Sequence, residues 1–305
     1  MQKNNSLKVI LLALVCNVLW GSLFPCIKLG YEAFHIDGSN VPQIMTFAGA
    51  RFFVSGIIIV AFGLLKKEKL PIGKNQGLPA ILLGGLFAII LHYSFTYVGL
   101  SMTDSSKTAI LKQLATLLYI CFGFLIVKEE KFSLGKLLGG LVGFGGIILI
   151  NTGSGSLQLT LGDWLIIAAS VCVVVSNVFN KQAMKKATPI MTTGVSHFAG
   201  GVVLLAIGLA GGGRITFTWE SIPVFAYICV ASIIAYCLWN YVINTADLSK
   251  MFIIKFAEPL FACLFGWLLV GEDIFKLEYL GAFVLICGGI LLGNITPKKE
   301  KSRII

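Results

Sequence analysis

The sequence is short of charged residues. Asp, Glu, Lys and Arg make up only 12% of its 305 residues, about half of the share that soluble domains carry. Hydrophobic residues make up 57%, and the mean hydropathy is +0.89. A soluble globular domain is therefore excluded, and we expect an all-α integral membrane protein.

Acidic residues and histidines are scarce as well. The chain holds 14 Asp or Glu residues and three His, and they are widely dispersed. An integral membrane enzyme, such as a lipid-linked group transferase, would need a cluster of these residue types at one membrane interface. We therefore expect no enzymatic activity and no cofactor, and the membrane enzyme stays as an alternative.

Motifs of soluble cofactor and metal sites are missing too. No GxxxxGK[ST] phosphate-binding loop occurs, and none of the eight Cys forms a CxxC pair. The longest expected loop, residues 30–43, leaves no room for a soluble catalytic or nucleotide-binding domain. Disulfides, metal sites and nucleotide hydrolysis are not expected.

What the sequence does have is ten apolar runs. Each is close to the roughly 20 residues that a helix needs to cross the hydrocarbon core. The first run follows Lys3 and Lys8, as in a signal peptide, but no small-residue cleavage site follows, so we expect a retained helix. The predicted spans are residues 9–29, 44–65, 78–99, 106–127, 134–152, 162–183, 189–211, 222–243, 250–271 and 278–295.

Basic residues are unevenly divided between the loops. The termini and alternate loops hold sixteen Lys or Arg residues, whereas the opposite loops hold only Arg214 and Lys276. By the positive-inside rule both termini are cytoplasmic, which requires an even number of spans, and we expect a plasma-membrane protein. Because the basic residues are split among six short segments, nucleic-acid binding is not expected.

An internal repeat divides the chain into two halves. Shifting residues 101–151 by 143 positions superimposes identical residues, charged ones among them, and the second helix of each half shares four residues at a shift of 145. We predict repeats at residues 1–152 and 153–297, followed by a basic cytoplasmic tail at 298–305. The thirteen matched residues of the first half are Asp104, Ser106, Lys107, Ile110, Lys112, Leu117, Gly123, Val127, Glu129, Phe132, Gly145, Gly146 and Asn151.

Five helices per repeat is an odd number, so the second repeat must enter the membrane from the opposite side. The halves are then inverted about a pseudo-twofold axis in the membrane plane. Transporters use this arrangement for alternating access, with the substrate site near the midplane between the repeats. We therefore predict ten transmembrane helices in two inverted five-helix repeats around a central cavity.

Several segments resemble the EamA-like transporters of the drug/metabolite transporter superfamily. The segment FAEPLFACLFGWLLVGED is similar to the family signature "L-E-P-V-F-A … L-L-G-E", and NVLWGSLFPCIKLG, which contains Trp20, looks like the family's first helix. Arg51 with Phe52, and the run from Gly162 to Trp164, are similar too. The resemblance covers nearly the whole chain. It implies a ten-helix fold with a central cavity and secondary transport of metabolites, amino acids or drugs, often outward.

Two lysines lie deep in predicted spans. A charge at the bilayer centre costs about 2.5 to 3.5 kcal/mol on insertion scales, so it should face a polar cavity or a partner. Lys112 and Lys255 are roughly 7.5 Å deeper than Lys107 and Lys250, at about 1.5 Å per residue. We predict that Lys112 and Lys255 approach the midplane and bind an acidic or zwitterionic group.

Two further charges complete the predicted binding site. Glu258 would bind a cation or couple transport to protons, but because it lies three residues after Lys255, a local ion pair is the alternative. Arg51 is the second predicted anion site, with a structural pairing as its alternative.

The remaining polar candidates are assigned more loosely. His92, Tyr236 and Asn240 either bridge helices by hydrogen bonds or contact the substrate. Asn177 and Asn180 flank the predicted substrate path, and Trp20 lines the cavity or provides bulk. Glu129 and Glu272 close their helices at opposite membrane faces, as gating residues or as ordinary interfacial caps.

These observations favour a secondary active transporter of a small polar metabolite, an amino acid or another carboxylate-bearing compound, that works by alternating access and exports its substrate. The sequence leaves open whether proton coupling or substrate exchange drives transport. The expected partners are the small-molecule substrate and the lipid bilayer, and the chain is expected to be a monomer or a homodimer. Besides the enzyme, the alternatives are a passive channel and a non-transporting membrane partner.

Overall fold

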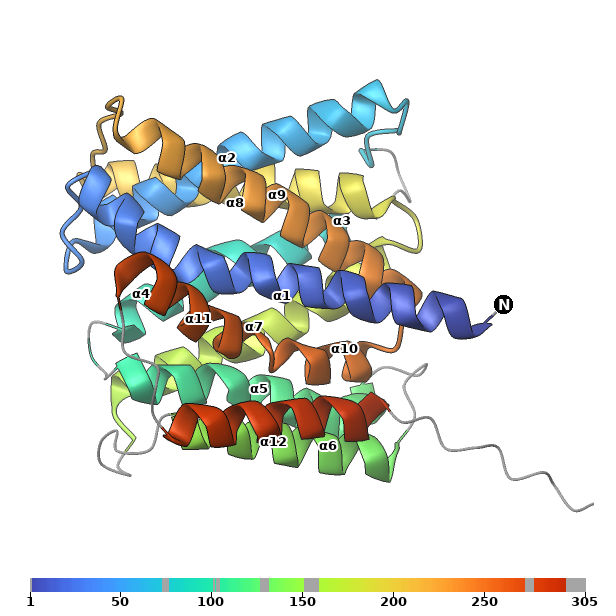
Figure 1. Ribbon diagram of the computed structural model, residues 1–305. Helices are drawn as coiled ribbons and strands as arrows, with labels where there is room; N and C mark the ends of the chain where they lie inside the picture. The colour runs from blue at the N-terminus through green and yellow to red at the C-terminus, as the bar shows by residue number, and fades with distance from the viewer. Residues whose placement is uncertain are drawn as a thin grey trace, which may run out of the picture.

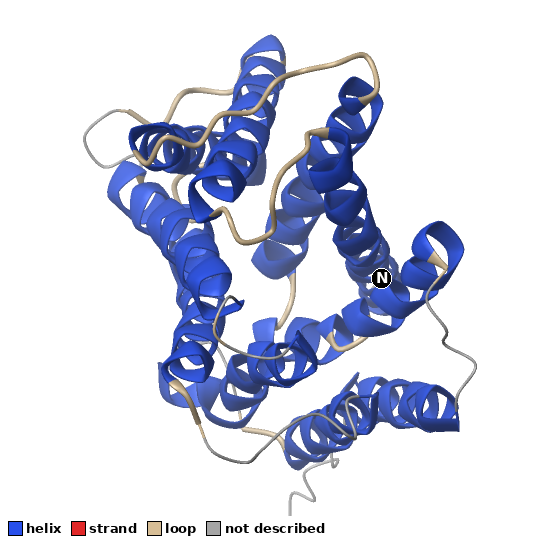
Figure 2. Cartoon of the chain, turned by 90° about the vertical axis from the view of Figure 1, so that its left-hand side faces the viewer, coloured by secondary structure: helices blue, strands red, loops and turns tan. Residues whose placement is uncertain are grey.

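The described part of the chain is helical throughout. The computed structural model describes residues 2–72, 77–100, 102, 105–126, 132–150, 159–271 and 277–294, and none of these residues lies in a β-strand. Figure 1 shows the helices running roughly side by side. Figure 2, a view turned by 90°, shows them arranged around the middle of the bundle.

Helices cover all ten predicted ranges. The elements are α1 (Gln2–Ala33), α2 (Val41–Leu65), α3 (Leu78–Gly85), the π-helix η1 (Leu86–Leu91), α4 (His92–Leu100), α5 (Ser105–Ile126), α6 (Leu134–Ile150), α7 (Leu161–Ala183), α8 (Pro189–Ala210), α9 (Ser221–Thr245), α10 (Leu248–Lys255), α11 (Glu258–Val270) and α12 (Leu277–Asn294).

Seven helical stretches among the described residues are long and apolar enough to cross a membrane. They are Leu7–Ala33, Val41–Leu65, Leu78–Gly99, Leu161–Ala183, Pro189–Ala210, Ser221–Thr245 and Leu248–Val270. Three more apolar helices are shorter: Leu111–Cys121, Leu134–Leu149 and Leu280–Gly293. The chain is a multi-pass membrane protein.

Two of the predicted spans are less regular than the sequence suggests. Residues 78–99 were expected to form one plain helix, but the π-helical turn η1 interrupts it immediately before His92. A π-turn adds one residue to the helix and rotates the residues that follow it. Nothing in the sequence marks this turn, so an α-helical wheel misplaces the side chains of α4.

The span predicted at 250–271 breaks between α10 and α11. Pro259 has no N–H, and its ring would clash with the carbonyl of the residue four positions earlier, which is Lys255. The chain responds with a turn at Phe256 and Ala257, after which Glu258 opens α11. The carbonyl of Ile254 accepts a hydrogen bond from the Asn17 side chain of α1 at 3.2 Å, as a helix break inside a membrane requires.

Two close helix crossings join the chain's halves. In the first, a Cβ at Gly56 of α2 would strike the backbone of Phe198 in α8, and a Cβ at Gly201 of α8 would strike the backbone of Phe53 in α2. In the second, a Cβ at Gly139 of α6 would lie 2.6 Å from the carbonyl oxygen of Gly289 in α12, which Figure 1 shows alongside α6. The small residues let the helix backbones approach within one chain.

Candidate functional site

A cavity of about 560 Å³ occupies the middle of the bundle. Its volume lies within the range of sites for small molecules. The structure brings all ten residues predicted to bind substrate to its lining: Trp20, Arg51, His92, Lys112, Asn177, Asn180, Tyr236, Asn240, Lys255 and Glu258. They come from eight elements, α1, α2, α4, α5, α7, α9, α10 and α11.

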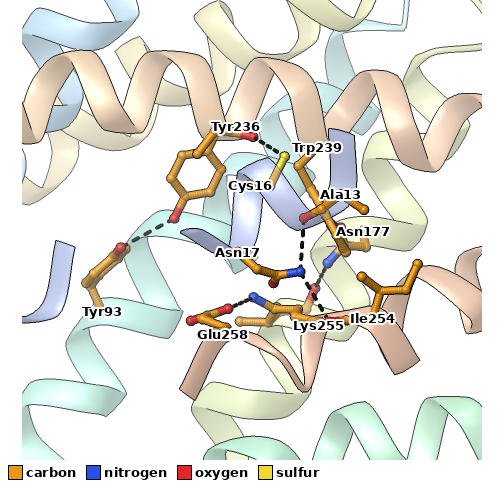
Figure 3. A network of polar contacts seen from close by, with 12 residues as sticks. Ala13, Cys16, Asn17, Tyr93, Asn177, Tyr236, Trp239, Ile254, Lys255 and Glu258 are labelled. Atoms are coloured by element: carbon orange, nitrogen blue, oxygen red, sulfur yellow. Dashed lines mark hydrogen bonds and ion pairs between the residues drawn. The ribbon is translucent and has the colours of Figure 1, made fainter. Parts of the chain in front are cut away.

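Lys255 and Glu258 face each other across the break between α10 and α11. Lys255 Nζ lies 2.5 Å from Glu258 Oε2, and the two side chains are only 15% and 13% exposed. The ammonium also lies 4.1 Å from the ring centroid of Trp20, a cation–π contact. Of the alternatives for this pair, the local ion pair is present (Figure 3).

Arg51 is buried without an acidic partner. Its side chain is 2% exposed, and Nη2 donates a hydrogen bond to the Tyr93 hydroxyl at 2.8 Å. The guanidinium lies 4.3 Å from the ring centroid of Phe52, and its Nε has no hydrogen-bond partner. Within the described chain no Asp or Glu lies within ion-pair distance of Arg51, so its structural pairing is with the Tyr93 hydroxyl and the Phe52 ring.

Lys112 is the second cation without an acid. Its ammonium lies 5.7 Å from the ring centroid of Phe24, and among the described residues it has no ion pair. The carbonyl of the preceding residue, Leu111, accepts a hydrogen bond from the Ser170 hydroxyl of α7 at 3.1 Å. This hydrogen bond joins α5, next to Lys112, to α7 in the second half of the chain.

An aromatic wall joins the two ends of the cavity. The Tyr93 and Tyr236 hydroxyls lie 3.4 Å apart (Figure 3), and the Tyr236 ring packs edge-on to Trp20 with centroids 5.4 Å apart. Trp20 in turn packs 5.2 Å from Trp239. This wall runs from the hydrogen-bond partner of Arg51 to the rings beneath Lys255, and it offers apolar faces with a few polar edges.

The other predicted polar residues are partly occupied. His92 Nδ1 lies 3.1 Å from the carbonyl of Ala169, which is the predicted bridge between helices. Asn177 accepts a 2.7 Å hydrogen bond from Trp239 Nε1, and Asn240 donates one of 2.7 Å to Thr193. Asn180 keeps a buried carbonyl oxygen without a partner.

Several lining residues were not among the predicted ones. They include Tyr93, Tyr97 and His197 among the ring-bearing residues, Gln113 and Thr116 on α5, and Lys28 on α1. His197 packs against Tyr236, with centroids 4.6 Å apart, and also lines the cavity. The four-residue spacing of Tyr93 and Tyr97 was the available signal, since such residues share a helix face.

The predicted gating residues Glu129 and Glu272 lie outside the described residues. An ion pair that was not predicted joins the buried Lys136 of α6 to Asp247. Asp247 is also the N-cap of α10, and its side chain accepts a hydrogen bond from the backbone N–H of Lys250 at 3.1 Å. The pair ties the start of α6 to the start of α10, at the opposite end of the bundle from the end of α1.

The fold and the cavity define an integral membrane protein with a central cavity that several charged and polar side chains line, the form expected of a transporter. Comparison with known sequences specifies the class: the EamA-like transporter family matches at residues 7–152 and 160–294. The chain therefore belongs to the EamA-like transporter family.

Individual relatives agree with this assignment. "Uncharacterized inner membrane transporter YedA" of Escherichia coli K12 is 26% identical over 279 residues, covering 90% of this chain and 87% of that protein. "Uncharacterized transporter YoaV" of Bacillus subtilis is 25% identical over 309 residues, covering 96% and 99%. A crystal structure with 16% identity superposes with a TM-score of 0.78, covering 94% of this chain and 96% of that chain, and shows the fold alone.

Proposed function

We propose that this protein is a secondary active transporter that moves a small polar metabolite, an amino acid or another carboxylate-bearing compound, by alternating access. The observation that carries the proposal is the enclosed cavity, in which Arg51 and Lys112 present positive charge without a described acidic partner. A buried cation needs a counter-charge, and a bound carboxylate supplies it.

Reciprocal contacts support ten spans in two inverted repeats. The repeat relates Gly56 to Gly201 and Phe53 to Phe198, and the observed close approaches are Gly56 to Phe198 and Gly201 to Phe53. Contacts in which residue i meets j and the equivalent of j meets the equivalent of i are those of a twofold axis.

The two ends of the cavity support alternating access. Its lining on α1 runs from Trp20 to Tyr31, two residues short of the end of that helix at Ala33. At the opposite end, Lys136 pairs with Asp247, and Lys181 Nζ donates to the carbonyl of Ala246 at 3.5 Å. If both termini are cytoplasmic, as the distribution of basic residues predicts, these contacts lie at the cytoplasmic end and support a closed cytoplasmic side.

We further propose that net flux is outward, as the family resemblance implies. Glu258 is the one carboxylate among the residues that line the cavity in the described chain. Because its partner Lys255 is close by, protonation of Glu258 or a charge on the substrate changes the same ion pair. Proton coupling and exchange of one substrate for another would both act through this pair.

Counterflow in proteoliposomes tests the function. Vesicles are loaded with unlabelled glutamate, alanine and succinate, and one labelled compound is added outside. A carrier accumulates the label transiently against its gradient. Flux that ignores the internal compound indicates a channel, and chemical conversion of the label indicates an enzyme.

Variants test the site in the same assay. Lys112→Ala and Lys255→Ala should each reduce counterflow strongly, whereas Arg214→Ala, an exposed residue in the loop after α8, should not. Unchanged kinetics in folded, membrane-inserted Lys112→Ala and Lys255→Ala proteins would contradict the assigned site.

A further inference from the structure

We propose that the transported compound carries two acidic groups, one bound at Arg51 and the other at Lys112. The inference rests on the proposed transport function and narrows its substrate class from carboxylate-bearing compounds in general to dianions.

The charge balance of the cavity leads to this proposal. Lys255 is neutralised by Glu258 at 2.5 Å. That ion pair uses the one carboxylate that lines the cavity in the described chain. Of the four basic residues that line the cavity, Lys28, Arg51, Lys112 and Lys255, two have no Asp or Glu within ion-pair distance in the described chain: Arg51 and Lys112. A ligand with two negative charges matches both of them.

Arg51 requires an anion because its guanidinium stays charged at any pH that a protein experiences. Its contacts are the Tyr93 hydroxyl at 2.8 Å and the ring faces of Phe52 and Tyr93, and these groups carry no net charge. Its buried Nε has no partner. The Tyr93 oxygen accepts the arginine's hydrogen bond, so the Tyr93 proton can be donated either to the Tyr236 hydroxyl at 3.4 Å or to an acidic group placed beside Arg51.

Lys112 differs from its repeat counterpart by one missing acid. Lys255 has Glu258 three residues later, whereas the residue three positions after Lys112 is Ala115. The repeat thus keeps both lysines and keeps a carboxylate beside only one of them. Glu258 acts on Lys112 electrostatically, but its ion pair is with Lys255. The direct counter-charge of Lys112 is the one that the ligand would supply.

The same balance argues against a simple zwitterion. An amino acid with one carboxylate would bring an ammonium into a cavity whose described carboxylate is already paired with Lys255. It would also leave one of the two unpaired cations without a counter-charge. The aromatic wall from Tyr93 through Tyr236 to Trp20 suits a short carbon skeleton between two acidic groups.

Matched ligands measure the contribution of the second charge. The dissociation constants of C3 to C6 dicarboxylates, their monoamides and glycerol phosphate are measured by titration calorimetry on protein in nanodiscs. At least one dianion should bind about tenfold or more tightly than the monoamide of its size, since hydrogen bonds to charged groups contribute at least this much. The comparison of dicarboxylates with the phosphate ester identifies which kind of acidic group the site takes.

Variants then locate the two subsites. In Arg51→Gln and in Lys112→Gln the ratio of the monoamide's dissociation constant to the dianion's should fall towards one, because only the interaction with the second charge is lost. The conservative variants Arg51→Lys and Lys112→Arg should retain most of the preference, which separates a binding role from a folding role. Arg214→Gln, in an exposed loop, is the control and should retain the wild-type ratio.

Three outcomes would overturn the proposal: no dianion binds, monoamides bind as tightly as dianions, or both variants weaken dianions and monoamides equally. Counterflow keeps this separate from transport itself. Counterflow of a monoanion or amino acid with no preference for dianions would overturn the inference and leave the transport function standing. Tight dianion binding without counterflow of any bound ligand would instead overturn the transport function.

Discussion

Lys112 and Lys255 match at the shift of 143 positions in the sequence, but their environments differ. In both, the carbonyl just before the lysine accepts a hydrogen bond from a helix of the other half: Leu111 from Ser170, and Ile254 from Asn17. Around Lys255, however, Pro259 breaks the helix and Glu258 neutralises the ammonium. The two halves thus share the position of the lysine but not its counter-charge. We expect the ligand to bind at Lys112, in the half that lacks the carboxylate.

Removing Glu258, the acid that pairs with Lys255, should have the largest effect. Glu258→Gln leaves Lys255 buried without a counter-charge, and breaking a buried pair in this way costs roughly 3 kcal/mol. The free energy of unfolding in mixed micelles should fall by about that amount. The double variant Glu258→Gln with Lys255→Met should recover most of it, and no recovery would show that Glu258 has another structural role.

Adding an acid near Lys112 should make its surroundings resemble those of Lys255. Ala115→Glu places a carboxylate three residues after Lys112 on the same helix face. If Lys112 binds the second acidic group of the substrate, dianion affinity should fall about tenfold, or about 1.4 kcal/mol. Titration calorimetry measures it, with Ala115→Gln as the uncharged control. Equal affinity in both variants would argue against a ligand charge at Lys112.

The ion pair between Lys136 and Asp247 is a second inequality between the halves. The repeat counterpart of Lys136 is Tyr279, so the sequence offers no equivalent charge pair at the other end. Lys136→Met should favour opening at this end by about 1 kcal/mol, or about fivefold in population. Hydrogen exchange at the start of α10 should rise accordingly. The exposed Lys186→Met is the control, and equal exchange in both variants would contradict a closing role.

Removing the hydrogen bonds to the carbonyls just before the two lysines should have the smallest effect. Asn17→Ala and Ser170→Ala each remove one donor to a carbonyl before a lysine, and hydrogen bonds between membrane helices are worth about 0.6 kcal/mol on average. The two losses in unfolding free energy should be similar. Ser232→Ala removes a bond within one helix, to the Ile228 carbonyl, and should cost less. A large difference between Asn17→Ala and Ser170→Ala would show that the break before Glu258 depends on Asn17.

The sequence predicted the helices well, because membrane helices are specified by local composition. Each span needs only a run of apolar residues of sufficient length, and the observed bounds differ from the predicted ones by a few residues. The two irregular stretches were missed for different reasons. Pro259 was a visible signal for the break between α10 and α11, whereas no residue type marks the π-turn before His92.

The candidate site was predicted in membership but not in pairing. Charged and polar residues are costly in a membrane span, so each one points to a cavity or a partner. This reasoning collected ten residues that do line one cavity. It missed Tyr93, although the four-residue spacing to Tyr97 was an available signal. It could not find the contact of Lys136 with Asp247 across 111 positions of sequence.

By itself, then, the sequence determined the membrane class, the helical ranges and the family resemblance, since hydropathy and repeat spacing are properties of the linear chain. Only the tertiary structure decided which cations are neutralised. The pair of Lys255 with Glu258 was one of two alternatives that the sequence left open, and Arg51 meets Tyr93 because α2 and α4 pack at the cavity. Those distances between helices depend on packing, which no local pattern records.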